Sequence, residues 1–187
     1  MIGELPTSLV IGGRTFPIRT DFRIILRIFA AWSDSALTDR EKCAVCLLDL
    51  FEHPEDITAD IAQEAVRAAY RFCAGGDEPD PDRPPVKLFD WTQDAPILMP
   101  AVSRAAGVPD VRALPYLHWW SFLGLFGEMP EGLFSTVLHI RSKRAEGRKL
   151  EKWEAAFARK NARLVELHTA AERAAMDETA RFLETIT

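Results

Sequence analysis

The residues with the clearest potential for chemistry are three cysteines and a nearby histidine. Cys43 and Cys46 form a C-x2-C pair, and His53 and Cys73 follow further along the chain. Three thiolates and one imidazole would complete a tetrahedral zinc site. However, the spacing places both members of the C-x2-C pair on the apolar side of a helix, whereas a zinc knuckle needs a turn there. Because free cysteine is among the most buried residue types, we interpret these thiols as core residues and predict no metal and no cofactor.

A second candidate for chemistry is His118, which could serve as a general base. It stands next to Trp119 and Trp120 in a strongly aromatic stretch, which favours a buried, hydrogen-bonded structural histidine. His139 and His168 lack a nearby serine, cysteine or aspartate in a recognisable nucleophile arrangement. We therefore predict no catalytic residues and a protein that is not an enzyme.

Two aspartates, Asp90 and Asp94, could pair as acid and base because they lie four residues apart. They also open a segment of helical periodicity. Aspartate at the start of a helix accepts hydrogen bonds from backbone N–H groups that have no partner inside the helix. We predict that both aspartates are capping residues.

The strongest charge feature is a basic run between residues 141 and 163. This stretch holds nine Lys and Arg against three Asp and Glu, a net charge of +6 in a chain whose total is −5. One interpretation is a helix C-terminus whose cations favour the macrodipole on a solvated face. The other is a surface for an acidic partner. Apart from Trp153, no aromatic interleaving suggests base stacking, so a protein is favoured over nucleic acid as that partner. The candidate partner-binding residues are Arg141, Lys143, Arg144, Arg148, Lys149, Lys152, Trp153 and Phe157.

Length and composition are those of an ordinary globular domain. The 187 residues fit one domain, and 48% hydrophobic with 27% charged content is typical. An acidic pI of about 5.4 argues against a nucleic-acid-binding protein. No stretch reaches the ~20 apolar residues of a membrane span, and the N-terminus lacks a signal-peptide pattern. Three cysteines, an odd number, are simplest to explain in a reducing cytoplasm.

The elements that would position these residues are mainly helical. Residues 6–18 predict the only β-structure, a hairpin with a Gly-Gly turn, because that two-residue turn needs positive φ. About six or seven helices follow, one of them opened by a capping box that begins at Thr38. We expect them to pack around a central helix over Leu114–Phe126, in which five of thirteen residues are aromatic. A helix that is apolar nearly all round and too short to cross a membrane is typical of a buried core.

Two further stretches differ from this pattern. Residues 75–85 hold four prolines and four acids, which predicts a mobile acidic loop within one domain. From Arg148 to about Glu184 the chain lacks proline and glycine. That segment is either one long helix, partly exposed and available to a partner, or it breaks near Asn161. Pro100 predicts a kink or a late start in the helix before the central one.

Three short blocks, in this order, resemble the bacteriophage Gp15 protein family of tailed siphophages and prophages. They are Arg19-Thr-Asp-Phe-Arg23, Asp90-Trp-Thr-Gln-Asp-Ala95 and Leu117-His-Trp-Trp-Ser-Phe122. The Leu-His-Trp-Trp block is the most specific, and the other two become informative through their order and spacing. The resemblance spans about residues 5–150. It predicts a helical domain over 1–150 and a C-terminal helical extension over 151–187 that has no clear counterpart in the family.

In such phages the gene usually lies between those for the major tail protein and the tape-measure protein. The resemblance therefore implies a non-catalytic tail-assembly chaperone in the host-cell cytoplasm, which coats the tape-measure protein before the tail tube polymerises around it. The tape-measure protein is the expected partner. The major tail protein and further copies of this chain are additional candidates, and no nucleic acid or membrane is expected. Two alternatives stay open: a structural virion component of the tail or connector, and a metal-binding or enzymatic protein.

Overall fold

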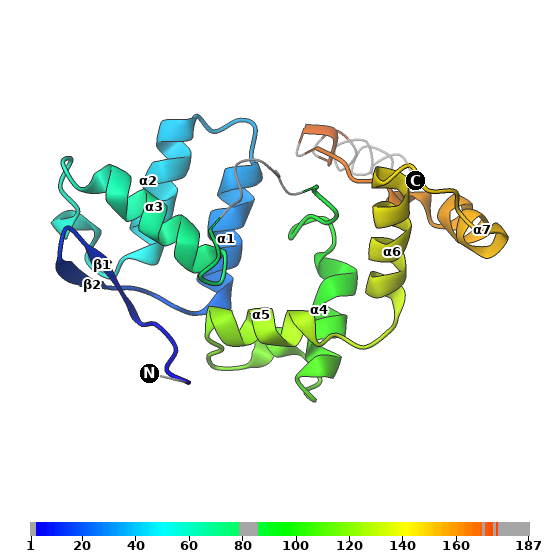
Figure 1. The fold of residues 1–187 in the computed structure, drawn as a ribbon, viewed down its shortest axis with the longest axis horizontal. Coiled ribbons are helices and arrows are strands. Elements are labelled where there is room, and N and C mark those ends of the chain that lie inside the picture. The colour runs from blue at the N-terminus through cyan, green and yellow to red at the C-terminus, as the bar shows by residue number, and fades with distance from the viewer. Residues whose placement is uncertain (1–2, 79–85, 170, 174, 176–187) are drawn as a thin grey trace, which may run out of the picture.

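The computed structural model describes residues 3–78, 86–169, 171–173 and 175. The chain folds into an N-terminal β-hairpin followed by helices, which confirms the mainly α fold that the sequence predicts. In Figure 1 the hairpin and the first three helices form one side, α6 and α7 form the other, and α4 and α5 lie between them. Most of the predicted acidic loop and the end of the predicted C-terminal helix lie outside the described residues.

The predicted hairpin is confirmed, with its turn at the two glycines. Strands β1 (Ser8–Ile11) and β2 (Arg14–Pro17) pair antiparallel. Gly12 and Gly13 have φ values of +56° and +76°. Both angles lie in the left-handed region that a two-residue hairpin turn requires and that side chains disfavour. The turn sets the register, and with it the burial of Phe16 in the core.

Side-chain caps fix the starts of the first helices. Asp21 accepts a hydrogen bond from the backbone N–H of Arg23 at 3.0 Å and so caps α1. The predicted capping box is present at α2, where Thr38 and Glu41 each accept a hydrogen bond from the other's backbone N–H. The elements of this side are α1 (Phe22–Ser33), α2 (Asp39–Leu50), the short 3-10 helix η1 (Pro54–Asp56) and α3 (Ala62–Cys73).

Helix α4 (Ala95–Ala105) runs through Pro100, so the predicted late start is wrong. Pro100 has no N–H to donate to the carbonyl of Pro96, but both prolines are exposed and that carbonyl can be hydrated. Gly107, with φ +66°, then closes the helix by donating its N–H to the carbonyl of Arg104 at 3.1 Å. A second 3-10 helix, η2 (Val111–Ala113), follows.

The central helix starts later than the sequence predicts. Helix α5 spans Trp119–Gly127 rather than Leu114–Phe126, and His118 is its N-cap. The residues before it run beside the start of α1, and the backbone N–H of Trp119 donates to the carbonyl of Thr20 at 2.7 Å. Because this pairing holds the backbone extended, the aromatic stretch cannot form its first turn as helix.

Helix α5 also buries only one side. Trp119 and Phe122 are fully buried, whereas Gly124 is exposed and Tyr116, outside the helix, keeps 53% of its surface. The prediction of a helix enclosed all round is therefore wrong. Periodicity located the aromatic side correctly but could not show that solvent covers the opposite side.

The C-terminal part consists of α6 (Leu133–Ala145), α7 (Lys152–Lys160) and α8 (Ala162–Val165). The predicted break near Asn161 is confirmed, because this residue ends α7 and its side-chain amide donates to the carbonyl of Phe157 at 3.0 Å. A small apolar cluster of Ile140, Ala158 and Val165 packs these helices against one another.

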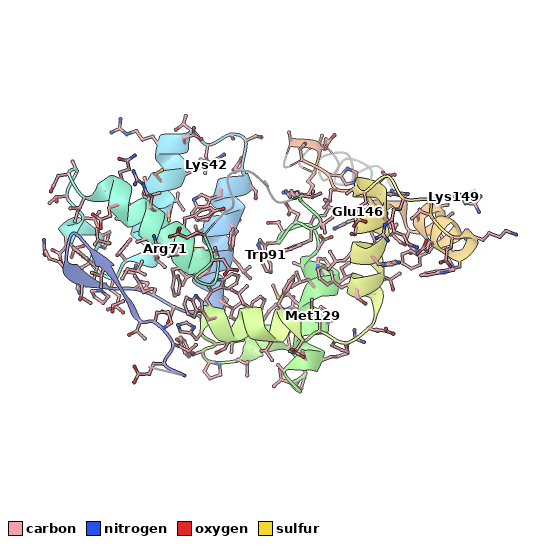
Figure 2. The ribbon with its side chains drawn as sticks, viewed as in Figure 1. Lys42, Arg71, Trp91, Met129, Glu146 and Lys149 are labelled. Carbon is pink, nitrogen blue, oxygen red and sulfur yellow. The ribbon has the colours of Figure 1, made fainter. Side chains whose placement is uncertain are left out.

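A cluster of aromatic rings joins the two sides of the molecule. Phe122 stacks on Phe22 of α1, with ring centroids 4.7 Å apart and planes inclined by 6°, and on Trp119 at 5.5 Å. Trp91, labelled in Figure 2, packs against Trp119 at 5.6 Å and against Phe126 at 5.3 Å. The main core therefore centres on α5, as the aromatic density of the sequence predicts.

Replacing Phe122 by alanine should lower the free energy of unfolding by about 3–5 kcal/mol, because a fully buried aromatic ring leaves a cavity. Urea denaturation followed by far-UV circular dichroism measures the loss. The matched control is Trp153→Ala, which removes a ring that is 53% exposed and should cost less than about 1 kcal/mol. Equal losses for the two variants would contradict the assignment of α5 to the core.

Candidate partner-binding surface

Arg141 is not a surface residue, so the prediction that it binds a partner is wrong. Its side chain is 4% exposed and forms a bidentate ion pair with Asp94, which is 1% exposed. The two N–O distances are 2.7 and 2.9 Å. Arg141 lies on the buried side of α6 with Phe134 and Val137, and the buried carboxylate is what allows a cation there.

The remaining donors of Arg141 bind three backbone carbonyls. The guanidinium donates to the carbonyls of Leu88, Leu164 and Val165 at 3.0, 2.5 and 3.0 Å. The last two carbonyls close α8 and have no partner inside that short helix. Arg141 therefore joins the segment before α4 to the end of α8.

Lys143 is also held inside the protein. Its ammonium lies 2.5 Å from a carboxylate oxygen of Glu154, whose side chain is 1% exposed, and His139 contacts the same oxygen at 3.0 Å. The hydrogen bond from Lys143, together with one from the backbone N–H of Glu151, holds the pKa of Glu154 below its ordinary value of 4.5. This cluster fastens α7 to α6, so Lys143 has a structural role.

The other predicted residues lie at the surface. Arg144, Lys149 and Lys152 are exposed and make no ion pair within the part of the chain that the structure describes. Arg148 is exposed but paired with Glu146 at 2.7 Å. The eight candidates thus separate into two buried structural cations and a set of surface residues at the end of α6 and the start of α7. Figure 2 labels Lys149 and Glu146 in this region.

Trp153 gives this region an apolar contact. The ring is 53% exposed, and its indole N–H donates to a carboxylate oxygen of Glu151 at 3.0 Å. It lines a groove of about 630 Å³ together with Glu131, Gly132, Ser135, Thr136 and His139. Phe157 is half-buried against the small apolar cluster of Ile140, Ala158 and Val165.

A second groove meets the first at the start of α6. It has a volume of about 450 Å³ and is mostly apolar, and Leu133, 44% exposed, belongs to it. Gly132 lines the first groove and Leu133 the second. We call the two together the α6 trough. Little in the sequence indicates this trough, because the second groove depends on α4 and the turn after it. Its lining there consists of Pro96, Ile97, Pro100, Ser103, Arg104, Val108 and Pro109.

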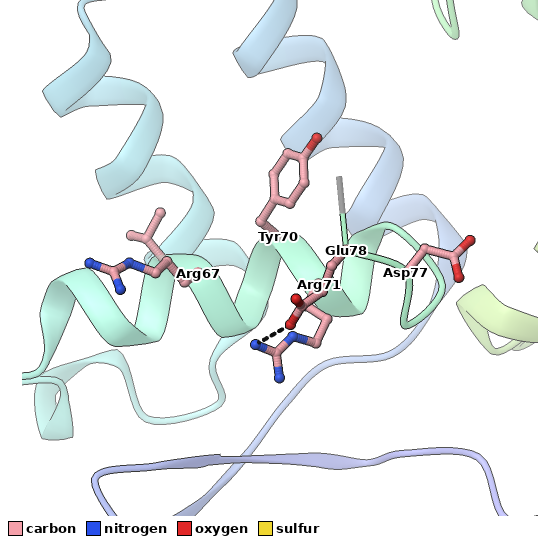
Figure 3. A pocket seen from close by; sticks show the side chains of 6 residues that line it. Arg67, Tyr70, Arg71, Asp77 and Glu78 are labelled. Carbon is pink, nitrogen blue, oxygen red and sulfur yellow. Dashed lines mark ion pairs between the residues drawn. The ribbon is translucent and has the colours of Figure 1, made fainter. Parts of the chain in front are cut away.

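A third hollow lies beside α3, as Figure 3 shows, and sequence reasoning missed it. It has a volume of about 540 Å³ and is lined by Val66, Arg67, Tyr70, Arg71, Asp77 and Glu78. Arg71 is already paired with Glu78 at 2.9 Å, and Tyr70 stacks on Trp32 with 5.7 Å between centroids. The only sequence signal was the helical spacing of two arginines and a tyrosine.

Cys46 and Cys73 are buried in the core, as predicted, whereas Cys43 is only partly buried. Burial raises the pKa of the Cys46 thiol to about 12, and that of Cys73 also rises. Thiols of this kind are poor nucleophiles and poor metal ligands because both roles need the thiolate. No group of three His, Cys, Asp or Glu within the described residues could hold a metal ion.

His118 is a buried structural residue, as predicted. Its Nδ1 accepts the backbone N–H of Trp120 at 3.0 Å, which caps α5. In the neutral ring the proton is then on Nε2, and Nε2 donates to the carbonyl of Pro6 at 2.9 Å. Both nitrogens are occupied, so this ring has no free nitrogen for a proton-transfer step.

The two aspartates of the second block divide between different roles. Asp90 caps its turn by accepting the backbone N–H groups of Thr92 and Gln93 at 3.0 and 2.9 Å, as predicted. Burial raises the pKa of Asp90. The hydrogen bonds that it accepts from the Lys87 ammonium and from the backbone N–H of Gln93 outweigh this effect, so the pKa lies below its ordinary value. Asp94 makes no side-chain cap and instead pairs with Arg141, so its predicted capping role is wrong.

The side chains of the first block, Arg19–Arg23, likewise connect segments that are distant in the sequence. Arg19 donates to the carbonyls of Leu48 and Asp49, each at 3.1 Å, and to two carbonyls just after α2. Thr20 bonds the hydroxyl of Tyr116 at 2.6 Å. These side chains close the end of α2 and hold the strand-like segment before α5 in place.

Comparison with known proteins gives one match. A family model described as Bacteriophage Gp15 protein matches residues 1–167. The matched range includes α7 and α8, so it reaches beyond residue 150, where the resemblance read from the three blocks ended. No curated protein and no solved structure matches the chain. Within the described residues, no helix is both long and apolar enough to cross a membrane.

Replacing Arg141 by methionine should lower the free energy of unfolding by about 3–5 kcal/mol, because Asp94 is left buried without its cation. Urea denaturation measures the loss. Arg144→Met, the matched control on the same helix, should change stability by less than about 0.5 kcal/mol. The double variant Arg141→Met with Asp94→Leu should recover part of the loss, since no charge stays buried. A double variant no more stable than Arg141→Met would contradict this account.

The stability of the α6–α7 contact should fall in acid. Because the folded-state pKa of Glu154 is below its ordinary 4.5, its contribution is present above that pH and is lost as pH falls through the folded pKa. Glu154→Gln should be less stable at neutral pH and should lose less on acidification. Thermal unfolding between neutral and acidic pH measures both effects. Glu128→Gln, an exposed control, should keep the wild-type acid dependence. If its slope matches that of Glu154→Gln, the assignment is wrong.

Proposed function

The chain belongs to the bacteriophage Gp15 protein family, and on this premise we propose that it is a tail-assembly chaperone that binds the tape-measure protein. Membership of the family indicates a structural or tail-related phage protein. The finer role rests on the surfaces of this chain. A chaperone for a long apolar protein needs an exposed surface that buries apolar helix transiently and releases it again.

The observation that carries the proposal is the α6 trough. Each of its two grooves contains an exposed apolar side chain: Trp153, 53% exposed, lies in the first groove, and Leu133, 44% exposed, lies in the second. Exposed apolar surface of this kind, rimmed by polar groups, is typical of protein-binding sites. An amphipathic helix laid in such a groove contacts it through residues on one face. Arg104 and Glu131 lie at the rim, where they can meet polar groups flanking the bound helix.

The surface cations supply a second contact region, for an acidic surface. Arg144, Lys149 and Lys152 lie toward the last turn of α6 and the start of α7, where Lys152 directly precedes Trp153 of the trough. The two regions therefore border each other at the start of α7. We retain Arg144, Lys149 and Lys152 as proposed partner-binding residues. Arg141 and Lys143 stabilise the fold through their ion pairs with Asp94 and Glu154.

The proposed role includes no catalytic step. The thiol of Cys46 is protonated in the core, both nitrogens of His118 are hydrogen-bonded, and Asp94 is paired with Arg141. These groups were the candidates for chemistry in the sequence. Each is used by the fold instead, and we propose that binding alone accounts for function in the host-cell cytoplasm.

Replacing Leu133 by serine together with Trp153→Ala should reduce the tape-measure protein captured in co-purification by at least about tenfold. Buried aromatic anchors commonly contribute about 2 kcal/mol or more to an interface. The matched control is Leu5→Ser, because Leu5 is 43% exposed but lies outside the trough. Capture that is equal in both variants would remove the trough as the binding site.

Mass spectrometry of purified phage particles tests the class of function separately. A chaperone is absent from mature tails, whereas a structural component of the tail or connector is present in fixed copy number. Stoichiometric protein in washed particles would therefore replace the proposed chaperone role by the structural one.

A further inference from the structure

The surface of this protein is divided into two ends of opposite charge. Residues 49–64 contain six Asp and Glu and no Lys or Arg. Of these, Glu52, Glu55, Asp56 and Asp60 are exposed, and we call them the acidic end. Glu55 contacts His53 at 3.3 Å, but Glu52 and Asp56 make no ion pair within the described part of the chain.

The opposite surface carries cations without partners. Arg144, Lys149 and Lys152 form what we call the basic end. None of the three pairs with a carboxylate among the described residues, although Lys143 and Arg148 close by are paired. Charges that the fold leaves unpaired are available to a second molecule.

The two ends lie far apart on the molecule. Figure 1 places the connection from α2 to α3, which carries the acidic end, at one end of the longest axis and α7 at the other. Figure 2 labels Lys149 at that second end. We infer that the acidic end of one copy docks on the basic end of another, so that copies of this chain associate head to tail.

Charge complementarity selects a second copy in this orientation. A two-fold dimer joined through either end would bring like charges together, whereas a head-to-tail contact pairs carboxylates with cations at every interface. An apolar contact supports the pairing, because Leu48, beside the acidic end, is 61% exposed. The methylene stems of two lysines at the basic end can cover such a side chain.

A head-to-tail contact repeats. It gives a ring when the rotation between copies closes and an open chain when it does not. In either assembly each copy brings its own α6 trough, whose Trp153 borders Lys152 of the basic end. The inference does not depend on the proposed function, because association can be measured on the purified protein alone.

Sedimentation analysis over a range of protein concentrations tests the inference. At low salt the average mass of the wild type should rise above the 21.0 kDa of the monomer. It should return to the monomer value in high salt, since the screening length shrinks from roughly 20 Å at about 0.02 M to roughly 4 Å at about 0.5 M. A wild type that stays monomeric at low salt and high concentration overturns the inference.

Charge reversal identifies the surfaces. The variant Arg144→Glu, Lys149→Glu, Lys152→Glu has two acidic ends, and the variant Glu52→Lys, Asp56→Lys, Asp60→Lys has two basic ends. Each alone should lose association, and an equimolar mixture should regain it. Circular dichroism confirms that each variant is folded.

A charge-matched control separates the surface from the net charge. The variant Arg40→Glu, Arg67→Glu, Arg112→Glu makes the same change in net charge as the basic-end variant, at exposed positions outside both ends. It should associate like the wild type. Two results overturn the inference: a mixture of the two reversed variants that stays monomeric, or a control that loses association as fully as the basic-end variant.

Discussion

The buried ion pair between Arg141 and Asp94 is the constraint on which the arrangement of the C-terminal half depends. A guanidinium has five N–H donors, and here all five are used: two on the carboxylate and three on backbone carbonyls. Full satisfaction matters because a buried charge costs several kcal/mol unless it is paired and hydrogen-bonded. The carbonyls come from the segment before α4 and from α8, so one side chain on α6 fixes both. The apolar cluster beneath these helices is too small to do so alone.

The three blocks that carry the family resemblance act in the same way. The Arg19 side chain donates to backbone carbonyls in the last turn of α2. His118 connects the start of α5 to the N-terminal segment by bonding the backbone of both Trp120 and Pro6. Gln93 binds the extended segment after α8, donating to the carbonyl of Glu166 at 2.6 Å and accepting the N–H of His168 at 2.9 Å. Each block joins segments that are distant in sequence. The motifs that identify the family therefore describe its fold, and the surfaces for partners lie elsewhere.

Because the polar side chains at these contacts are buried, we propose that function lies at the surface. Two features there support this: the exposed apolar anchors of the α6 trough, and charges of opposite sign at the two ends. The trough is built around the first turn of α6 and Trp153, and the basic end begins at the last turn of α6 and continues to Lys152. A chain of copies along a long partner would shield more apolar surface than separate copies, with each contact individually weak.

The sequence by itself determined the features that depend on neighbouring residues. The Gly-Gly hairpin, the capping box at Thr38 and the family assignment all follow from short segments. Tertiary structure decided the rest. Arg141 and Arg144 belong to the same basic run, but only Arg141 faces a carboxylate brought from another helix, so one is core and the other surface. The start of α5 depends on backbone pairing with Thr20, about a hundred residues earlier in the chain. The trough at the start of α6 depends on α4. Neither contact can be read from neighbouring residues, because the segments that make it are distant in the sequence.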